Sequence, residues 1–443
     1  MRFNPLALMV GFVLTAAVLT WVLPAGQFER RQDVATGRSV VVPGSYRPVD
    51  PNPIGPFQAA VAIPKGMVNG ASLVFLIFLA GGVFGIVDRT GALRHGVEWL
   101  AGRLQNRERL MVPLSCIVFA IAGAVESMWE EFVALTPVLV LLARRVGFDA
   151  VTAVGMSLGA AGVGAAFSPM NPFGVGIAQK FAELPLMSGW EFRVAVLVPA
   201  VAFWIWGTMR HAARTRTTPE AAATIAPATL GLRHGLALAA LVAMFPVLAF
   251  GLLRLGWDLE QMSAVFFVTG AVIGLASGLG IDGTTEAFFE GCRAIAAAAL
   301  LLGVARSIFV VLDEGRIVDT IVNALVTPLA SLPVTVFAAG VSAVQALLAV
   351  AVPSSSGRVA MTMPILVPLS DLLGLSRQVL VMATQYWSGM VNQFLPTDGA
   401  LLAVLSVAGV SLPQWLRYAV PLSVALMLLG LAALGVAVAL DVQ

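Results

Sequence analysis

The chain is poor in charged residues. Charged residues make up 11% of its 443 positions and hydrophobic residues 59%, whereas a soluble domain carries about 25% charged residues. The net charge of +2 comes without a basic run, so we expect no nucleic-acid partner. Mean hydropathy is +0.91, and many apolar runs approach or exceed the ~18 residues that indicate a membrane-spanning helix. We therefore predict an all-α polytopic membrane protein whose main partner is the lipid bilayer.

Cysteine and histidine are almost absent too. Cys116 and Cys292 both lie in apolar runs, so neither a disulfide framework nor a Cys/His metal site is indicated. The three histidines fall in polar connections, and no metalloprotease, nucleophile-elbow or P-loop motif occurs. We expect a protein that is not an enzyme and that uses no cofactor beyond a coupling ion, Na⁺ or H⁺.

The second half of the chain repeats the first. When Asp88 is aligned with Asp313, both aspartates close an apolar run. The polar segments 167–172 and 393–398 then lie roughly opposite each other, and each interrupts a long apolar stretch. Two copies of one interrupted apolar unit are typical of secondary transporters, which bind substrate where the helices are broken.

The apolar runs predict nine membrane crossings and two re-entrant hairpins. Uninterrupted crossings are expected at about 6–24, 67–87, 191–208, 235–253, 261–280, 293–312 and 416–440, and interrupted ones at about 149–180 and 378–408. The hairpin arms are 110–125 with 132–143, and 333–352 with 358–369. Amphipathic segments precede them at 89–109 and 315–330, and residues 25–58 form a polar loop.

The second half has one more crossing before its repeated core, so the two units should be inverted relative to each other. We divide the chain into a first repeat, 1–208, a cytoplasmic linker, 209–234, and a second repeat, 235–443. With the N-terminus in the cytoplasm, the arginine-rich segments 89–109 and 209–234 are cytoplasmic, as the positive-inside rule favours. The C-terminus is then external, and we expect the protein in the bacterial cytoplasmic (inner) membrane.

The tip of the first hairpin is acidic. A carboxylate at membrane depth costs about 2.5–3.5 kcal/mol on insertion scales, so it normally faces a cavity or a partner. Glu130 and Glu131, together with Ser127, are therefore candidates for binding a substrate, a proton or an amine. The alternative is that the two glutamates cap the N-terminus of the second arm, where acidic residues are favoured.

The tip of the second hairpin is rich in serine and ends in an arginine. It comprises Ser354, Ser355, Ser356, Gly357 and Arg358. These residues open a half-helix, whose free backbone N–H groups and positive dipole end attract an anion. The Arg358 guanidinium is able to hold a carboxylate with two hydrogen bonds. The alternative is a serine cap, with Arg358 paired to Asp398 or to a glutamate of the first tip.

The first interrupted crossing is rich in glycine and then in proline. Gly162 and Gly164 permit the helix to unwind, although small residues also serve close helix packing. The prolines that follow, on either side of Met170 and Asn171, demand an interruption. We expect Gly162, Gly164 and Ser168 to contribute to a coupling-ion site and Asn171 to contact the substrate.

The second interrupted crossing presents Asn392, Thr397 and Asp398. Freed carbonyls with hydroxyl, amide and carboxylate oxygens suit Na⁺. We expect Asp398 to hold the coupling ion, either Na⁺ or a proton, and Asn392 and Thr397 to contact the substrate.

Short motifs along most of the chain resemble the anaerobic C4-dicarboxylate carrier (DcuC-like) family, especially its YfcC-like branch of basic-amino-acid or carboxylate antiporters. The motifs are Trp21–Phe28, Glu130-Glu131, Asn171-Pro172-Phe173, Gly176–Gln179, Pro353-Ser354, Ser356-Gly357, Thr362–Ile365 and Ser376-Arg377-Gln378. The resemblance implies membership of the ion-transporter superfamily, with a scaffold domain, a mobile transport domain that moves like an elevator, and a homodimer. Arg358 stands where the branch is expected to carry an uncharged polar residue, which favours an anionic substrate.

These observations favour a secondary active transporter of a small carboxylate-bearing solute, C4-dicarboxylate-like, driven by Na⁺, by H⁺ or by exchange. An amino-acid antiporter of the basic-amino-acid type stays open, with Glu130 or Glu131 holding the amine. An intramembrane hydrolase with a nucleophile among residues 354–356 is a remote alternative, because no histidine follows to activate such a serine.

Overall fold

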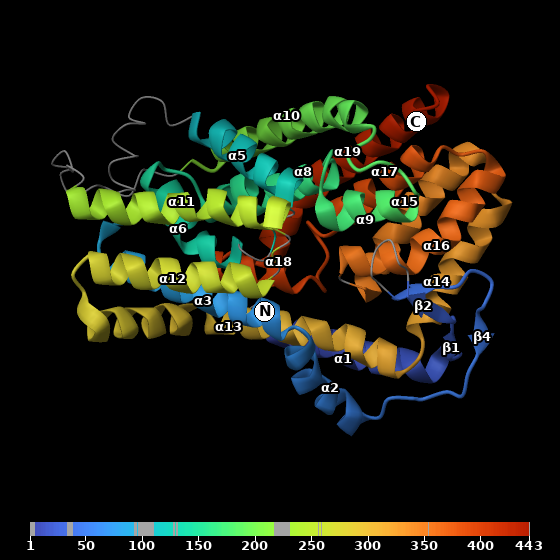
Figure 1. The fold of residues 1–443 in the computed structure, drawn as a ribbon, viewed down its shortest axis with the longest axis horizontal. Helices are drawn as coiled ribbons and strands as arrows, with labels where there is room; N and C mark the ends of the chain where they lie inside the picture. Colours follow the sequence, from blue (N-terminus) through green and yellow to red (C-terminus); the bar gives the residue numbers. More distant parts are fainter. Residues whose placement is uncertain are drawn as a thin grey trace.

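The computed structural model of the chain describes residues 5–32, 39–92, 95, 110–126, 129, 132–216, 231–255, 257, 259–352 and 354–442. These residues are mostly helical, and several helices lie along the long axis of the molecule (Figure 1). Five described helices are long and apolar enough to cross a membrane: α3 (Ala71–Arg89), α10 (Trp190–Arg214), α12 (Leu259–Ala276), α13 (Gly280–Glu314) and α19 (Leu412–Ala439).

The first half begins with α1 (Pro5–Val22), α2 (Pro56–Asn69) and α3 (Ala71–Arg89). The helix pair α5 (Met111–Glu126) and α6 (Phe132–Arg145) occupies the region of the first expected hairpin. The interrupted crossing consists of α7 (Ala150–Val154), the π-helix η2 (Gly155–Gly159), α8 (Ala160–Ala166), η3 (Pro172–Gly176) and α9 (Ile177–Phe181). Helix α10 (Trp190–Arg214) follows.

The second half begins with α11 (Leu232–Leu255), α12 (Leu259–Ala276) and α13 (Gly280–Glu314). It continues with α14 (Val318–Val326) and the 3₁₀ helix η4 (Thr327–Ser331), and then the helix pair α15 (Val334–Ala351) and α16 (Ser355–Leu373). The second interrupted crossing consists of α17 (Arg377–Val391) and α18 (Gly399–Ala408), before the final α19 (Leu412–Ala439).

The polar loop after α1 corrects the all-α prediction, because it holds short strands at one end of the molecule (Figure 1). Strand β1 (Gly26–Gln27) pairs antiparallel with β4 (Arg47–Pro48), and β2 (Arg30–Gln32) with β3 (Ser39–Val41). The loop is anchored to α14, where Asp319 accepts a hydrogen bond from Phe28 N–H at 3.0 Å and pairs with Arg30 at 2.7 Å.

Helix boundaries also differ from those expected, most of all at α2 and α13. Helix α2 begins at Pro56, a residue pre-organised for a helix start. The sequence instead predicts a polar loop up to residue 58 and a crossing that begins at 67. Helix α13 begins at Gly280 instead of near 293, and its polar first half faces α3. There Glu286 and Glu290 pair with Arg89 at 3.1 and 2.9 Å. The amphipathic segment 89–109 lies almost wholly outside the described residues.

Helix α13 is the element on which the N-terminal helices pack. It contacts α1, α2, α3 and α12. The crossing with α3 is close, because a Cβ atom at Gly85 would lie 2.7 Å from the Cα of Gly291. On another side α13 contacts α18, so the second interrupted crossing lies directly against this group of helices.

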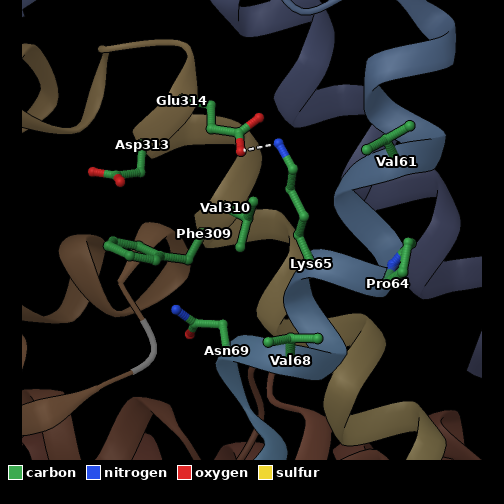
Figure 2. A pocket seen from close by; sticks show the side chains of 9 residues that line it. All are labelled: Val61, Pro64, Lys65, Val68, Asn69, Phe309, Val310, Asp313 and Glu314. Atoms are coloured by element: carbon green, nitrogen blue, oxygen red, sulfur yellow. Dashed lines mark hydrogen bonds and ion pairs between the residues drawn. The ribbon is translucent and has the colours of Figure 1, made fainter.

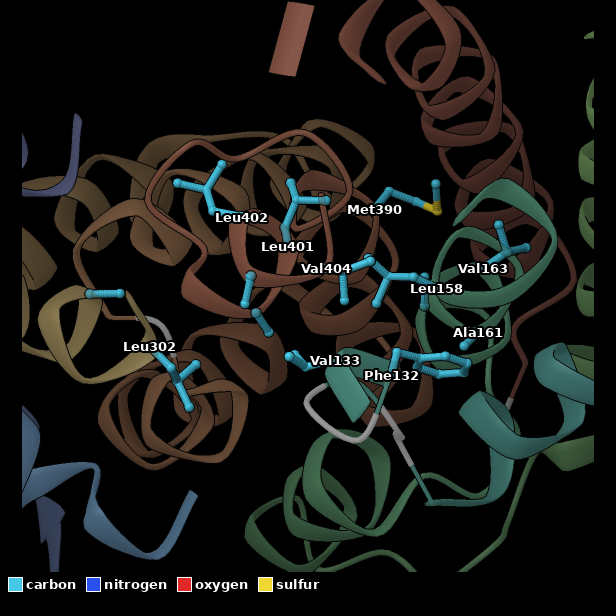
Figure 3. Close-up of a cluster of buried hydrophobic side chains, with 14 of the residues drawn as sticks. Phe132, Val133, Leu158, Ala161, Val163, Leu302, Met390, Leu401, Leu402 and Val404 are labelled. Atoms are coloured by element: carbon cyan, nitrogen blue, oxygen red, sulfur yellow. The ribbon is translucent and has the colours of Figure 1, made fainter. Parts of the chain in front are cut away.

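The helix pairs and the interrupted crossings form the rest of the molecule. Within the first half α5 packs on α8, and within the second half α15 packs on α17. Apolar side chains from both halves meet in one core (Figure 3). Those labelled there are Phe132, Val133, Leu158, Ala161, Val163, Leu302, Met390, Leu401, Leu402 and Val404, and all are buried. This core holds the two helix breaks in place.

Candidate functional site

The first helix break begins later than the sequence predicted. The prediction that the helix unwinds at Gly162 and Gly164 is wrong, because both glycines lie inside α8, which ends at Ala166. Proline explains the difference. Pro169 and Pro172 lack an N–H donor and clash with a preceding helical turn, whereas glycine only permits unwinding. The part of these glycines in an ion site stays a prediction.

Glycine serves close packing in α8. A Cβ atom at Gly162 would collide with the side chains of Gln393 and Trp129, and one at Gly164 would collide with the backbone of Ala120 in α5. The two glycines therefore allow the first hairpin region and the second break to approach α8 closely.

The polar side chains of the first break bind their own backbone. Ser168 Oγ accepts hydrogen bonds from the N–H groups of Met170 at 3.0 Å and Asn171 at 2.7 Å. The same hydroxyl donates to the carbonyl of Ala124 in α5 at 2.5 Å. Asn171 Oδ1 accepts a hydrogen bond from Gly174 N–H at 3.0 Å and so caps the N-terminal end of η3. These bonds replace helical bonds that the prolines remove.

The second break runs from Asn392, which caps the C-terminus of α17, to Asp398, which caps the N-terminus of α18. The Asp398 carboxylate accepts a hydrogen bond from Leu401 N–H at 2.8 Å. Between the caps, Gln393 Nε2 donates to the carbonyl of Gly159 at 2.7 Å. Gln393 Oε1 and Thr397 Oγ1 are buried and have no hydrogen-bond partner within the described part of the chain. Two oxygen acceptors are thus available inside the protein.

The serine-rich tip caps α16 through the side chain of Ser354. Its hydroxyl accepts a hydrogen bond from Gly357 N–H at 3.2 Å and lies 3.2 Å from Ser356 Oγ. Arg358 is 1% exposed. Its guanidinium donates to the carbonyl of Val352 at 2.6 Å and to Ser355 Oγ at 3.1 Å.

The two tips and the second break meet at Asp398. Trp129, the described residue of the first tip, donates its indole N–H to the two Asp398 oxygens at 3.1 and 3.2 Å. The Asp398 carboxylate is also close enough to act electrostatically on Arg358. The N-termini of α16 and α18 therefore open at one charged cluster, in which Arg358 is buried and Trp129 and Asp398 are half-buried, as expected for binding an anion and a cation side by side. Ser127, Glu130 and Glu131 lie outside the described residues.

Two buried polar residues were missed in the sequence. Gln385 on α17 donates its Nε2 to the carbonyl of Ala165 at 2.6 Å, and its Oε1 is buried without a partner. Arg193, near the start of α10, is 0% exposed. It donates to the carbonyl of Ser188 at 3.1 Å and to Gln378 Oε1 at 2.6 Å. For Arg193, the signal available in the sequence was an arginine three residues after the start of an apolar helix.

A pocket of about 510 Å³ opens between α2 and α13 (Figure 2). Its lining residues are Val61, Pro64, Lys65, Val68, Asn69, Phe309, Val310, Asp313 and Glu314. Lys65 of α2 and Glu314 of α13 form an ion pair of 2.5 Å across it. The sequence had singled out Asp313 as the end of a repeat unit, and it lines this pocket.

The histidines are engaged away from the serine-rich tip. His211 pairs with Asp149 at 3.1 Å, and the rings of His95 and His234 stack at 4.4 Å. The hydrolase alternative gains no support, because these three are the only histidines in the sequence.

Comparison with known proteins agrees with the family resemblance. The family model described as "C4-dicarboxylate anaerobic carrier" matches residues 4–439. The Escherichia coli K12 protein named "Putative basic amino acid antiporter YfcC" is 30% identical, over 91% of this chain and 90% of that protein. An uncharacterized protein of Haemophilus influenzae is 29% identical, over 91% of this chain and 82% of that protein.

Two solved transporter structures are similar at low identity. The YdaH transporter of Alcanivorax borkumensis is 16% identical over 99% of both chains, with a TM-score of 0.48. MtrF of Neisseria gonorrhoeae, described as one of a class of antimetabolite efflux pumps, is 16% identical over 98% of this chain and 95% of that one, with a TM-score of 0.41. The match to the family model covers nearly the whole chain, so this multi-pass membrane protein belongs to the C4-dicarboxylate anaerobic carrier family of membrane transporters.

Proposed function

We propose that this protein is a secondary active transporter of a small carboxylate-bearing solute, coupled to Na⁺ or H⁺ or working by exchange. The observation that carries the proposal is the partly buried cluster in which Trp129, Asp398 and Arg358 join both hairpin tips to the second helix break. A charged cluster at interrupted helices is the usual form of a substrate and ion site in such transporters.

The anion side of the site is Arg358 at the N-terminus of α16. A guanidinium and the free N–H groups of a helix start both favour a carboxylate. The hydroxyls of Ser355 and Ser356 add donors on the same turn. This arrangement supports a carboxylate-bearing solute, as the C4-dicarboxylate family name also suggests for its members.

The coupling-ion side is the second break. Gln393 Oε1 and Thr397 Oγ1 are buried oxygens that make no hydrogen bond to any described residue, and the Asp398 carboxylate lies on the same segment. Hard cations prefer oxygen ligands of this kind, so these residues fit Na⁺. A proton on Asp398 is the alternative coupling ion.

The proposed transport mechanism is of the elevator type. Each hairpin packs on the interrupted crossing of its own half, α5 on α8 and α15 on α17, which supports two inverted repeats that form a mobile transport domain. The helices around α13 would then be the static scaffold, and two copies of the chain would join through scaffold surfaces as a homodimer in the inner membrane.

An amino-acid antiporter is the second candidate, supported by the name of the Escherichia coli relative. In that reading Arg358 holds the carboxylate of the amino acid, and Glu130 or Glu131 holds an amine. The two candidates differ in whether a positive group on the substrate is required for transport.

Uptake by proteoliposomes tests both. Purified protein is assayed with dicarboxylates, short-chain acids and basic amino acids, with the Na⁺ gradient and the pH gradient varied separately. We expect saturable, gradient-driven uptake of a carboxylate without an amine. Uptake restricted to basic amino acids would favour the antiporter, and an absence of uptake of any carboxylate would overturn the proposal.

Cysteine labelling tests the inverted topology. With Cys116 and Cys292 replaced by serine, Arg316→Cys should react with an impermeant thiol reagent added from outside. Arg103→Cys should react only after the membrane is permeabilised. Labelling of both positions from the same side would contradict the inverted-repeat model.

A further inference from the structure

A second buried polar cluster lies where α9, α10 and α17 meet, and we call it the Arg193 cluster. Its members are Gln179, Ser188, Arg193, Gln378 and Tyr386. Gln179 donates to the carbonyl of Ser188 at 3.0 Å, and Gln378 also contacts the Ser188 hydroxyl. Gln179 and Gln378 belong to two of the sequence motifs that carry the family resemblance, one in each half. Neither has a part in the proposed transport site.

The charge of Arg193 is not balanced within the cluster. Its hydrogen-bond acceptors are a backbone carbonyl and an amide oxygen, both neutral. Among the described residues, none of the carboxylates lies within ion-pair distance of it. The neighbouring carboxylates pair with Arg377 instead, Asp371 at 2.8 Å and Glu183 at 3.0 Å. A fully buried cation without a counter-charge is strongly unfavourable, so we expect an anion to bind beside Arg193.

Two polar atoms of the cluster have no hydrogen-bond partner among the residues that the structure describes. They are Arg193 Nε and Tyr386 Oη, and both are fully buried. The two side chains lie close enough to each other for an electrostatic interaction. Buried donors without partners are rare in folded proteins and indicate an ion or a water that completes them. An anion satisfies both hydrogen-bond donors and the charge of Arg193, whereas a water molecule leaves the charge unbalanced.

We propose that the Arg193 cluster binds one compact monovalent anion, a halide such as chloride or a carboxylate of formate size, between Arg193 Nε–H and Tyr386 O–H. The anion must be compact because both side chains are 0% exposed, which leaves no opening for a longer solute. The site is separate from the cluster around Asp398, and its existence does not depend on the transport function proposed above.

The position of the site gives the anion a structural consequence. Arg193 lies on α10 and Tyr386 on α17, and Gln179 extends the network to α9. An anion held between them ties the end of the first interrupted crossing to the start of the second. An ion that binds only the folded state stabilises it by mass action, so chloride should raise the melting temperature in a saturable manner.

Thermal melting of the purified full chain in detergent tests the site. Chloride replaces gluconate at constant Na⁺ concentration and ionic strength, and sodium formate forms a parallel series. We expect a saturable rise in Tm with chloride, with formate, or with both, and the two series identify which anion the site prefers. Arg193→Gln should abolish the rise. Tyr386→Phe should shift the half-saturating concentration upward by about tenfold or more, as expected for losing one hydrogen bond to a charged group.

Arg377→Gln is the matched control, because it removes a nearby arginine whose partners are carboxylates. This variant should keep the anion dependence. If Arg193→Gln does not fold, Tyr386→Phe decides, since it removes a hydroxyl that has no partner in the protein. A Tm independent of anion in the wild-type protein, or an unchanged half-saturating concentration in Tyr386→Phe, would overturn the proposal.

Discussion

The break after α8 and the break after α17 interrupt their helices at similar points of the two halves, yet they use their polar side chains differently. In the first, Ser168 makes three hydrogen bonds to backbone groups, and Asn171 opens η3. In the second, Asp398 caps α18, but Gln393 Oε1 and Thr397 Oγ1 are buried without a partner.

The difference has a cause in the sequence. The first break has two prolines within four residues, and the Ser168 hydroxyl compensates for the helical bonds that they remove. The second break has one proline in seven residues, so fewer backbone groups need a side-chain partner there. Its side-chain oxygens are therefore left for a ligand, and we expect substitutions at the second break to change transport and those at the first to change stability.

Asp398→Asn should give the largest effect. Asparagine caps a helix as well as aspartate does, so α18 should still begin at residue 399 and the protein should fold. The negative charge beside Arg358 is lost, and with it the ligand for Na⁺ or the proton. We expect no gradient-driven accumulation of substrate in proteoliposomes that carry this variant.

Asp371→Asn is the control for Asp398→Asn, because that carboxylate pairs with Arg377 at the far end of α16. It should leave accumulation intact. If Asp398→Asn still concentrates substrate with the wild-type ion dependence, Asp398 has only its capping role.

Arg358→Gln should give the next largest effect. A hydrogen bond to a charged group contributes about 1.5–3 kcal/mol, so losing one substrate contact should weaken binding about 10- to 100-fold. Glutamine keeps a polar side chain of similar length. The measurement is substrate affinity together with melting temperature on the same variant.

A structural role for Arg358 gives a different pattern. If the guanidinium only balances Asp398, Arg358→Gln should lose stability, and the double variant with Asp398→Asn should regain it. An unchanged affinity in a well-folded Arg358→Gln protein contradicts the assignment of the anion site.

Ser168→Ala should act on stability instead of transport. The change leaves two backbone N–H groups and one carbonyl without their partner, at about 1–3 kcal/mol per unsatisfied buried group. We expect a clear loss of melting temperature with little change in substrate affinity. A variant that melts normally but transports poorly would move the functional role to the first break.

Helix positions could be predicted from the sequence to a large extent. The ends of α1, α5, α6, α15 and α17 fall within a few residues of those expected, because apolar runs and prolines are local signals. The polar first half of α13 was not predicted, because it lacks the apolar run from which crossings are recognised; in the structure its Glu286 and Glu290 pair with Arg89 of α3. Contacts between distant segments leave no local pattern.

The site was predicted in part. The serine cap of α16 and the polar character of the second break follow from residue type. The prediction for the glycines of α8 was wrong because glycine permits either unwinding or close packing. The contact of Gly162 that favours packing is with Gln393, 231 positions further along the chain. Arg193 was missed because its burial depends on residues of α17.

Thr397→Val should give the smallest effect and the sharpest comparison with Ser168→Ala. Valine has nearly the shape of threonine, and the hydroxyl it removes makes no hydrogen bond in the protein. Replacing such a buried hydroxyl by a methyl group is close to neutral or stabilising, so the melting temperature should be unchanged or slightly higher. If the hydroxyl oxygen contacts the coupling ion or the substrate, the half-saturating concentration of that species should rise by roughly threefold to tenfold, less than a charge-assisted bond contributes. Thr397→Ser, which keeps the hydroxyl, should restore the wild-type value. A Thr397→Val protein with wild-type Na⁺, pH and substrate dependence would show that an unpaired oxygen at the second break does not mark a ligand contact, and the difference between the two breaks would then be one of packing alone.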